Sequence, residues 1–73
     1  MVTVYTQPNC QPCRATKKRM EKLGIPFNEV DITSDPSALD TLRAEGWQSA
    51  PVVKTQHETW GGFNPSKIDA LAS

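Results

Sequence analysis

The sequence predicts an α/β fold in which four strands form one mixed sheet flanked by three helices, in the order β-α-β-α-β-β-α. Short runs rich in β-branched and aromatic residues alternate with segments of helical periodicity, and Gly or Pro stands at most of the boundaries. A helical segment separates the first two strand-like runs, and such a crossover makes a right-handed parallel pair. Only a few residues separate the last two, which predicts an antiparallel hairpin.

The N-terminal half is predicted to form a strand, a helix and a second strand. Val2–Thr6 is rich in β-branched and aromatic residues, which is typical of a strand. A helix is predicted from Cys10 to Leu23, and Gly24 is expected to end it. The second strand is predicted over 27–32. The inward stripe of the helix is predicted to consist of Cys13, Thr16, Met20 and Leu23.

Two further helices are predicted from the residues that precede them. Asp35 is a good N-cap, and Pro36 suits the first helical position that follows it. Asn64 and Pro65 repeat this arrangement before the last helix, while Gly46 is expected to end the middle one. The residues expected to face the core are Leu39 and Leu42 of the middle helix, and Ile68, Leu71 and Ala72 of the last.

The hairpin is the least marked part of the pattern. The segment Gln48–Thr55 is interpreted as a loop that leads into the third strand, and His57–Trp60 as a short fourth strand. A tight turn near Gln56 is expected to join them, although no Asn-Gly or Asp-Gly pair marks it. A flexible loop over 61–65 then leads to the last helix.

Length, charge and hydropathy limit the possible functions. The 73 residues predict one domain, 1–73, and eight Lys and Arg balance eight Asp and Glu. A net charge of zero gives no indication of nucleic acid or of a membrane surface. The apolar stretches are only a few residues long, and no secretory signal pattern follows Met1. We therefore expect a cytoplasmic protein that is a monomer.

The motif Cys10-Gln11-Pro12-Cys13 carries the predicted chemistry. At positions i and i+3 of a helix start, the two sulfurs lie on one face and can bond. Free backbone N–H groups and the helix dipole favour a thiolate at Cys10, so Cys10 is the candidate nucleophile. Cys13 lies one turn further in, is more shielded, and is the candidate resolving thiol. Pro12 has a fixed φ and no N–H, so the two intervening residues are expected to influence the reduction potential.

Two other chemistries compete with redox exchange at this motif. A closed zinc site needs four ligands, and beyond the two thiols the chain offers only His57, which is expected to face solvent on the hairpin. A metal or iron–sulfur site would therefore need a second chain. A purely structural disulfide is disfavoured because a ring this small stabilises by only about 2 kcal/mol.

The predicted first helix is also rich in positive charge. It carries Arg14, Lys17, Lys18, Arg19 and Lys22 against a single Glu21. One interpretation is a solvated face whose charges are favourable near the helix C-terminus. The other is that these charges favour the thiolate and steer an acidic partner surface.

A C-x-x-C motif that opens the first helix of a βαβ unit resembles thioredoxin-like proteins. In the thioredoxin fold a cis-proline loop faces the redox pair, and Pro51 in Ala50-Pro51-Val52 is the position that matches it. The resemblance implies a cis peptide bond at Pro51. It also implies that the backbone of Ala50 is presented to an extended substrate segment for strand-like pairing.

More specifically, the whole chain resembles the NrdH-redoxins, small glutaredoxin-like electron donors to class Ib ribonucleotide reductase. The matching segments are V-T-V-Y-T, A-T-K-K, L-R-A-E-G-W, A-P-V-V and W-G-G-F-N-P. The resemblance implies reduction by thioredoxin reductase with electrons from NADPH. It further implies transfer of those electrons to the active-site disulfide of the large subunit of ribonucleotide reductase, with no bound cofactor besides the Cys10–Cys13 disulfide.

The last matching segment departs from the family pattern at two positions. Gly61 replaces the usual Ser and Asn64 the usual Arg, and the resulting Gly61-Gly62 pair is similar to the double glycine of glutaredoxins that bind glutathione. A glutathione-dependent glutaredoxin is therefore the alternative. Gln7, where glutaredoxins often have Lys, and bulky Phe63 argue against it.

Two tryptophans bear on a docking surface. The segment from Trp60 to Phe63 is predicted to belong to an exposed surface that suits a protein partner. The alternative is that one or both of these rings pack into the core. Trp47 is expected to cover the end of the middle helix, with partner contact as a lesser possibility.

Overall fold

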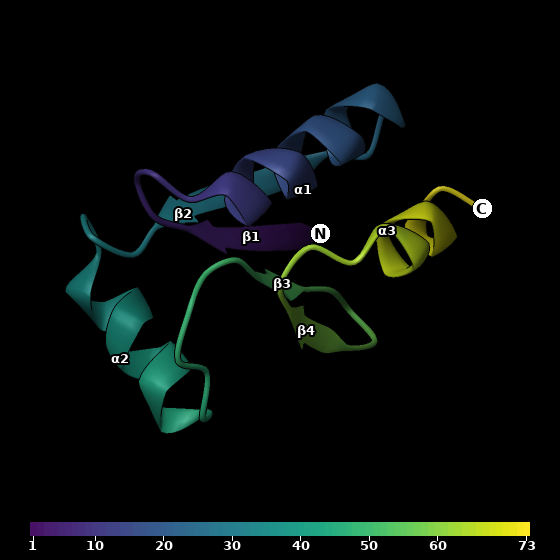
Figure 1. Cartoon of the computed structure of the whole chain (residues 1–73). Coiled ribbons are helices and arrows are strands. Elements are labelled where there is room, and N and C mark those ends of the chain that lie inside the picture. Colours follow the sequence, from purple (N-terminus) through teal and green to yellow (C-terminus); the bar gives the residue numbers. More distant parts are fainter.

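A computed structural model describes residues 1–73 and confirms the predicted element order (Figure 1). The sheet order is β2-β1-β3-β4, with β1 parallel to β2 and antiparallel to β3, and β3 antiparallel to β4. None of the helices combines the length and apolar character needed to cross a membrane. The elements are β1 (Val2–Thr6), α1 (Gln11–Lys22), β2 (Phe27–Asp31), α2 (Pro36–Ala44), β3 (Val52–Lys54), β4 (Thr59–Gly61) and α3 (Pro65–Leu71).

The hairpin turn is longer than the sequence predicts, and β4 begins at Thr59 rather than at His57. Thr55 organises this turn. Its backbone N–H donates to the Glu58 carbonyl at 2.9 Å, and its hydroxyl accepts from the backbone N–H groups of His57 and Glu58 at 3.2 and 3.0 Å. Hydrogen bonds to the Thr55 hydroxyl thus stabilise this turn, which has no Asn-Gly pair. His57 is exposed, as expected.

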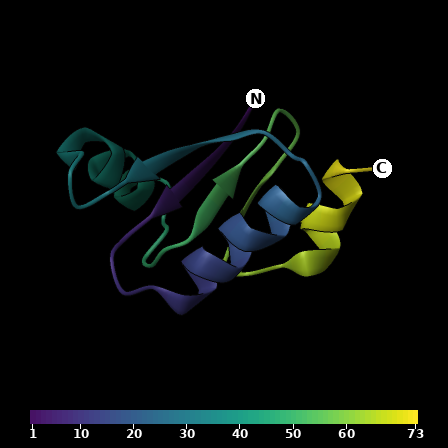
Figure 2. The same ribbon diagram turned by 90° about the horizontal axis from the view of Figure 1, so that it is seen from above.

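The sheet has a helical layer on each side (Figure 2). Helices α1 and α3 lie on one side, and α2 lies on the other. Side chains alternate across the strands, so two clusters form. Val4, Met20, Val53, Trp60 and Ile68 pack between the sheet, α1 and α3. Cys10, Cys13, Ile32, Leu42, Ala50 and Val52 form the second cluster, which therefore includes both thiol positions.

The prediction that Leu23 and Ala72 face the core is wrong. Leu23 is 37% exposed and Ala72 is also exposed. Both are C-cap residues: α1 ends at Lys22 and α3 at Leu71, so the chain leaves the helix before these side chains reach the sheet. The apolar stripes therefore end at Met20 in α1 and at Leu71 in α3.

A bidentate ion pair joins α1 to α3. Arg19 donates from Nε and Nη2 to the two carboxylate oxygens of Asp69 at 2.8 and 2.7 Å. These hydrogen bonds lower the pKa of Asp69 below its ordinary value of 3.8. Both side chains are more than one third exposed, so solvent weakens the pair.

The Arg19–Asp69 pair predicts a pH dependence of stability. Because the folded-state pKa of Asp69 is depressed, the stabilisation is complete above the unfolded pKa and is lost as pH falls through the folded one. When the pH is lowered from about 7 to about 2, the melting temperature should therefore fall further in the wild-type protein than in Asp69→Asn. Thermal denaturation followed by circular dichroism checks this. Asp40→Asn, which removes a carboxylate outside every ion pair, is the matched control, and equal losses in wild type and Asp69→Asn would contradict the prediction.

Candidate active site

The turn between β1 and α1 places Cys10 at the start of the helix. Asn9 has φ 58°, a left-handed conformation that Asn tolerates better than most residues. Cys10 follows in an extended conformation, with φ −113° and ψ 105°, and is the N-cap of α1. Gln11 and Pro12 occupy the first two helical positions, where the missing N–H of Pro12 leaves no intrahelical hydrogen bond unmade. The prediction that Cys10 lies at the helix N-terminus is confirmed.

Cys10 and Cys13 are joined by a disulfide, with their Cα atoms 5.2 Å apart. The Sγ of Cys10 accepts a hydrogen bond from the backbone N–H of Cys13 at 3.1 Å, so the cap of α1 is the sulfur itself. Cys13 is 1% exposed and Cys10 7%, which confirms that Cys13 is the more shielded. Both are nevertheless buried, whereas Gln11 and Pro12 between them are exposed.

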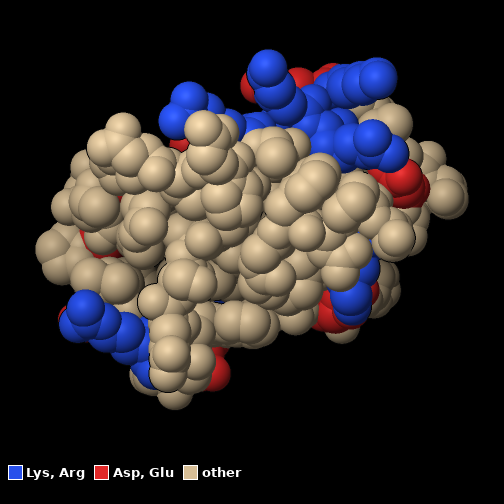
Figure 3. Space-filling view, viewed as in Figure 1, with Lys and Arg blue, Asp and Glu red and all other residues tan.

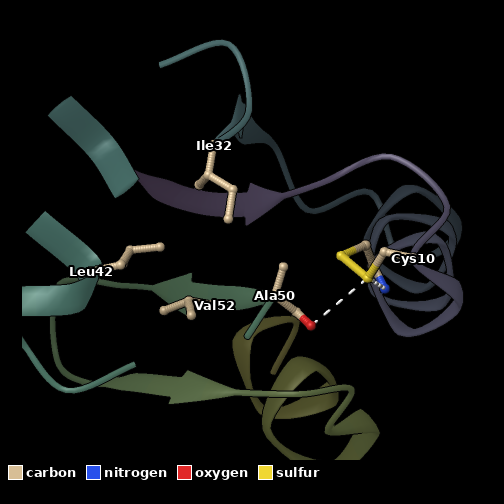
Figure 4. Close-up of a cluster of buried hydrophobic side chains, with 6 residues drawn as sticks. Cys10, Ile32, Leu42, Ala50 and Val52 are labelled. Atoms are coloured by element: carbon tan, nitrogen blue, oxygen red, sulfur yellow. Dashed lines mark hydrogen bonds between the residues drawn. A yellow bond between two sulfur atoms is a disulfide. The ribbon is translucent and has the colours of Figure 1, made fainter. Parts of the chain in front are cut away.

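The loop before β3 faces the disulfide. The Ala50–Pro51 peptide bond is cis, as predicted, and Pro51 is buried. The Sγ of Cys10 lies 3.8 Å from the Ala50 carbonyl oxygen (Figure 4). A disulfide sulfur carries no proton, so this is a contact in the oxidised form and becomes a possible S–H donation in the dithiol form. Neither the N–H nor the C=O of Ala50 hydrogen-bonds another backbone group.

Gly61, which ends β4, and Gly62, which follows it, are glycine for different structural reasons. Gly62 has φ +79°, a conformation that favours glycine, and its N–H donates to the Pro51 carbonyl at 2.9 Å. A Cβ at Gly61 would lie 3.1 Å from the Trp47 ring. Trp47 therefore packs directly on the Gly61 backbone, which gives a steric reason for the absence of the usual Ser. This contact was not predicted.

The predicted exposed surface from Trp60 to Phe63 is wrong for Trp60, and the alternative of core packing holds for this ring. Trp60 is 5% exposed, and its Nε1 is buried without a hydrogen-bond partner in the protein. Phe63 is 41% exposed, so it alone of the two rings lies on the surface. Trp60 faces the core because it pairs with buried Val53 across the hairpin.

A cavity of about 470 Å³ lies beside the Ala50 loop and was not predicted. It opens between the ends of β1 and β2, α2, and the segment that follows α2. Its lining residues are Gln7, Ile32, Thr33, Leu39, Leu42, Arg43, Gly46, Trp47, Gln48 and Ser49. These positions are scattered along the chain, and no local motif marks them.

The chain holds no group of three or more His, Cys, Asp and Glu side chains close enough to bind one metal ion. Cys10 and Cys13 would thus supply two ligands at most. A structural zinc site needs four. A metal at this position would therefore require donors from another chain.

Comparison with known proteins gives a consistent result. The glutaredoxin family model matches residues 2–59. The glutaredoxin-like protein NrdH of Salmonella typhimurium is 44% identical over 70 residues, covering 96% of this chain and 86% of that protein. NrdH of Lactococcus lactis is 36% identical over 72 residues, covering 99% and 100%. The solved structure of the NrdH-redoxin from Escherichia coli, described as having a thioredoxin-like activity profile, superposes with a TM-score of 0.93 at 38% identity, covering 96% and 92%.

Proposed function

This chain belongs to the glutaredoxin family and, within it, to the NrdH glutaredoxin-like proteins, and on that basis we propose that it carries electrons from thioredoxin reductase to class Ib ribonucleotide reductase. The protein is a thiol–disulfide oxidoreductase. The observation that carries the proposal is the Cys10–Cys13 disulfide at the N-terminus of α1, beside the Ala50 carbonyl. NADPH supplies the electrons to thioredoxin reductase, and the large subunit of ribonucleotide reductase receives them.

In the proposed reaction the Cys10 thiolate attacks one sulfur of the partner's disulfide. The partner's other sulfur leaves as a thiolate, takes a proton from solvent, and a mixed disulfide with Cys10 remains. The Cys13 thiolate then attacks the Cys10 sulfur and releases the partner's second thiol. Two electrons have passed to the partner, and the Cys10–Cys13 disulfide has formed. The dithiol of thioredoxin reductase returns it to the reduced form by the same exchange in reverse.

Backbone groups position the two sulfurs for these steps. The Cys13 N–H, 3.1 Å from the Cys10 sulfur, and the N-terminus of α1 both favour negative charge on Cys10. The N–H and C=O of Ala50 have no backbone partner, which leaves them to pair in strand-like fashion with the partner's segment that carries the disulfide. Pro51 holds that loop in place, and exposed Phe63 offers an apolar contact nearby.

Glutathione is the competing reductant because Gly61 and Gly62 resemble the double glycine of glutaredoxins. Two of the five backbone N–H groups between Gly62 and Lys67 are already hydrogen-bonded. Gly62 N–H bonds the Pro51 carbonyl, Lys67 N–H bonds the Asn64 side chain at 3.1 Å, and Pro65 has no N–H. A tripeptide with two carboxylates is best bound by cations, and residues 61–66 include no Lys or Arg. A protein reductant therefore fits better.

A coupled assay tests the proposal. NADPH consumption is measured at 340 nm with a disulfide substrate, once with thioredoxin reductase and once with glutathione plus glutathione reductase. We expect turnover with thioredoxin reductase and at least about tenfold less with glutathione, which corresponds to about 1.4 kcal/mol. Reduction of oxidised ribonucleotide reductase large subunit should then follow in the first system. Activity with glutathione alone would overturn the proposal.

A further inference from the structure

Half of the cations in this protein are not neutralised by ion pairs. Lys17, Arg19, Lys54 and Lys67 each pair with a carboxylate. The four that do not are Arg14, Lys18, Lys22 and Arg43. Three of these four lie on one helix, which is more than an even spread of charge would place there.

Arg14, Lys18 and Lys22 form a single row along α1, which we call the α1 stripe. They are four residues apart, so they lie one above the other on one face of the helix, and all three are exposed. The row is about 12 Å long at 1.5 Å per residue and begins at the residue after Cys13. Figure 3 shows the Lys and Arg side chains gathered over α1.

On the other side of the sheet, α2 and its cap carry two acidic residues and one cation, Arg43, outside ion pairs. Of the acidic residues outside ion pairs, Asp31 ends β2, while Asp35 and Asp40 belong to α2 and its cap. The fourth is Glu21, which lies on α1 close to Lys18 and reduces the positive charge of the stripe by one. Outside ion pairs, three cations and one carboxylate leave α1 with two positive charges, whereas two carboxylates and one cation leave α2 and its cap with one negative charge.

We propose that the α1 stripe is the docking surface for an acidic patch on the protein that exchanges disulfides with Cys10. The α1 stripe begins one turn from Cys10, the N-cap of α1, so a partner with carboxylates along α1 can place its disulfide at that end of the helix. Charged residues at the edge of a protein–protein interface act mainly on the association rate and on its salt dependence. This inference rests on the proposed function, because it assigns the surface through which that function's partners bind.

The test compares charge-neutralised variants with wild type in two reactions with proteins. Arg14→Gln, Lys18→Gln, Lys22→Gln and the triple variant are assayed with thioredoxin reductase at steady state, and in pre-reduced form with oxidised ribonucleotide reductase large subunit. We expect the triple variant to lose about tenfold in kcat/KM at low salt, through KM rather than kcat, and the loss to disappear at high salt. Lys54→Gln, which removes the same charge from β3, should retain the wild-type kcat/KM.

A small neutral disulfide separates docking from chemistry at the thiol. Pre-reduced wild type and triple variant should reduce 2-hydroxyethyl disulfide at equal rates, because this molecule has no acidic surface to dock. A loss in only one of the protein reactions identifies the partner that carries the acidic patch.

Three results would overturn the proposal. They are unchanged kcat/KM in both protein reactions, an equal loss with 2-hydroxyethyl disulfide, and an equal loss in Lys54→Gln. Failure of wild type with thioredoxin reductase alone would contradict the proposed function, while the ribonucleotide reductase arm would still report on the stripe. Failure of wild type in both arms would reject both proposals.

Discussion

Replacing Cys10 by serine is expected to abolish disulfide reduction, whereas replacing Cys13 by serine should stop the reaction at a mixed disulfide. A serine hydroxyl at position 10 is not ionised at neutral pH and cannot attack a disulfide, so the rate should fall by at least about 10³-fold, the scale on which enzymes lose activity with their nucleophile. In Cys13→Ser the nucleophile remains, but no neighbouring thiol can release the partner. Non-reducing electrophoresis and mass spectrometry of the adduct measure both outcomes.

The two variants together separate the roles of the thiols. The adduct of Cys13→Ser should contain one partner molecule bound through Cys10 and should dissociate on addition of dithiothreitol. Gln11→Ala, a change between the thiols that leaves both sulfurs, should still complete the reaction and is the control. An adduct that forms through Cys13 in the Cys10→Ser variant at a comparable rate would reverse the assignment of nucleophile and resolving thiol.

Local signals predicted most of the fold correctly because the residues concerned act within their own turn. The Asp35 carboxylate accepts from the Ala38 N–H at 3.2 Å, and the Asn64 side chain does the same for Lys67 at 3.1 Å. In each case the proline after the cap needs no hydrogen-bond partner. The same local reasoning located Cys10, because its place at a helix start depends only on the turn before it.

Local sequence signals could not predict the features that depend on how one face of a helix or strand packs against another element. Strand β4 has three residues, too few for an alternating pattern to show that Trp60 faces the core and Gly61 does not. The Trp47 ring, in the segment after α2, contacts Gly61 of β4. No sequence motif near either residue indicates this contact. The cavity beside the Ala50 loop is missed for the same reason, since it exists only between packed elements.

The redox site also shares its side chains with the core. Cys10 and Cys13 pack in one cluster with Leu42, Ala50 and Val52, so the geometry of the disulfide depends on the sheet and on α2. A 73-residue chain buries only about 60% of the surface of its unfolded form, and its expected stability is about 4–11 kcal/mol. Loss of a single core side chain should therefore remove a large share of the folding free energy.

Ile68 is the position where this effect should be largest. It is fully buried on α3 among Met20, Val53 and Trp60, so Ile68→Ala removes three methyl or methylene groups and leaves a cavity between α3 and the sheet. We expect it to lower the free energy of unfolding by about 2–5 kcal/mol, and Ile68→Val by about 0.5–1.5 kcal/mol. Urea denaturation at 25 °C, followed by circular dichroism, measures both values from the midpoint at a constant slope.

An exposed site on the same helix separates loss of packing from the change in helix propensity, which alanine raises at both positions. Ser66→Ala changes a solvent-facing residue of α3 and should alter the free energy of unfolding by less than about 0.5 kcal/mol. The graded order Ala, then Val, then wild type at position 68 follows only if α3 is held by its apolar contacts with the sheet and α1. If Ile68→Ala cost no more than Ile68→Val, the Arg19–Asp69 pair rather than packing would have to hold α3 in place, and Asp69→Asn would then be the more destabilising change.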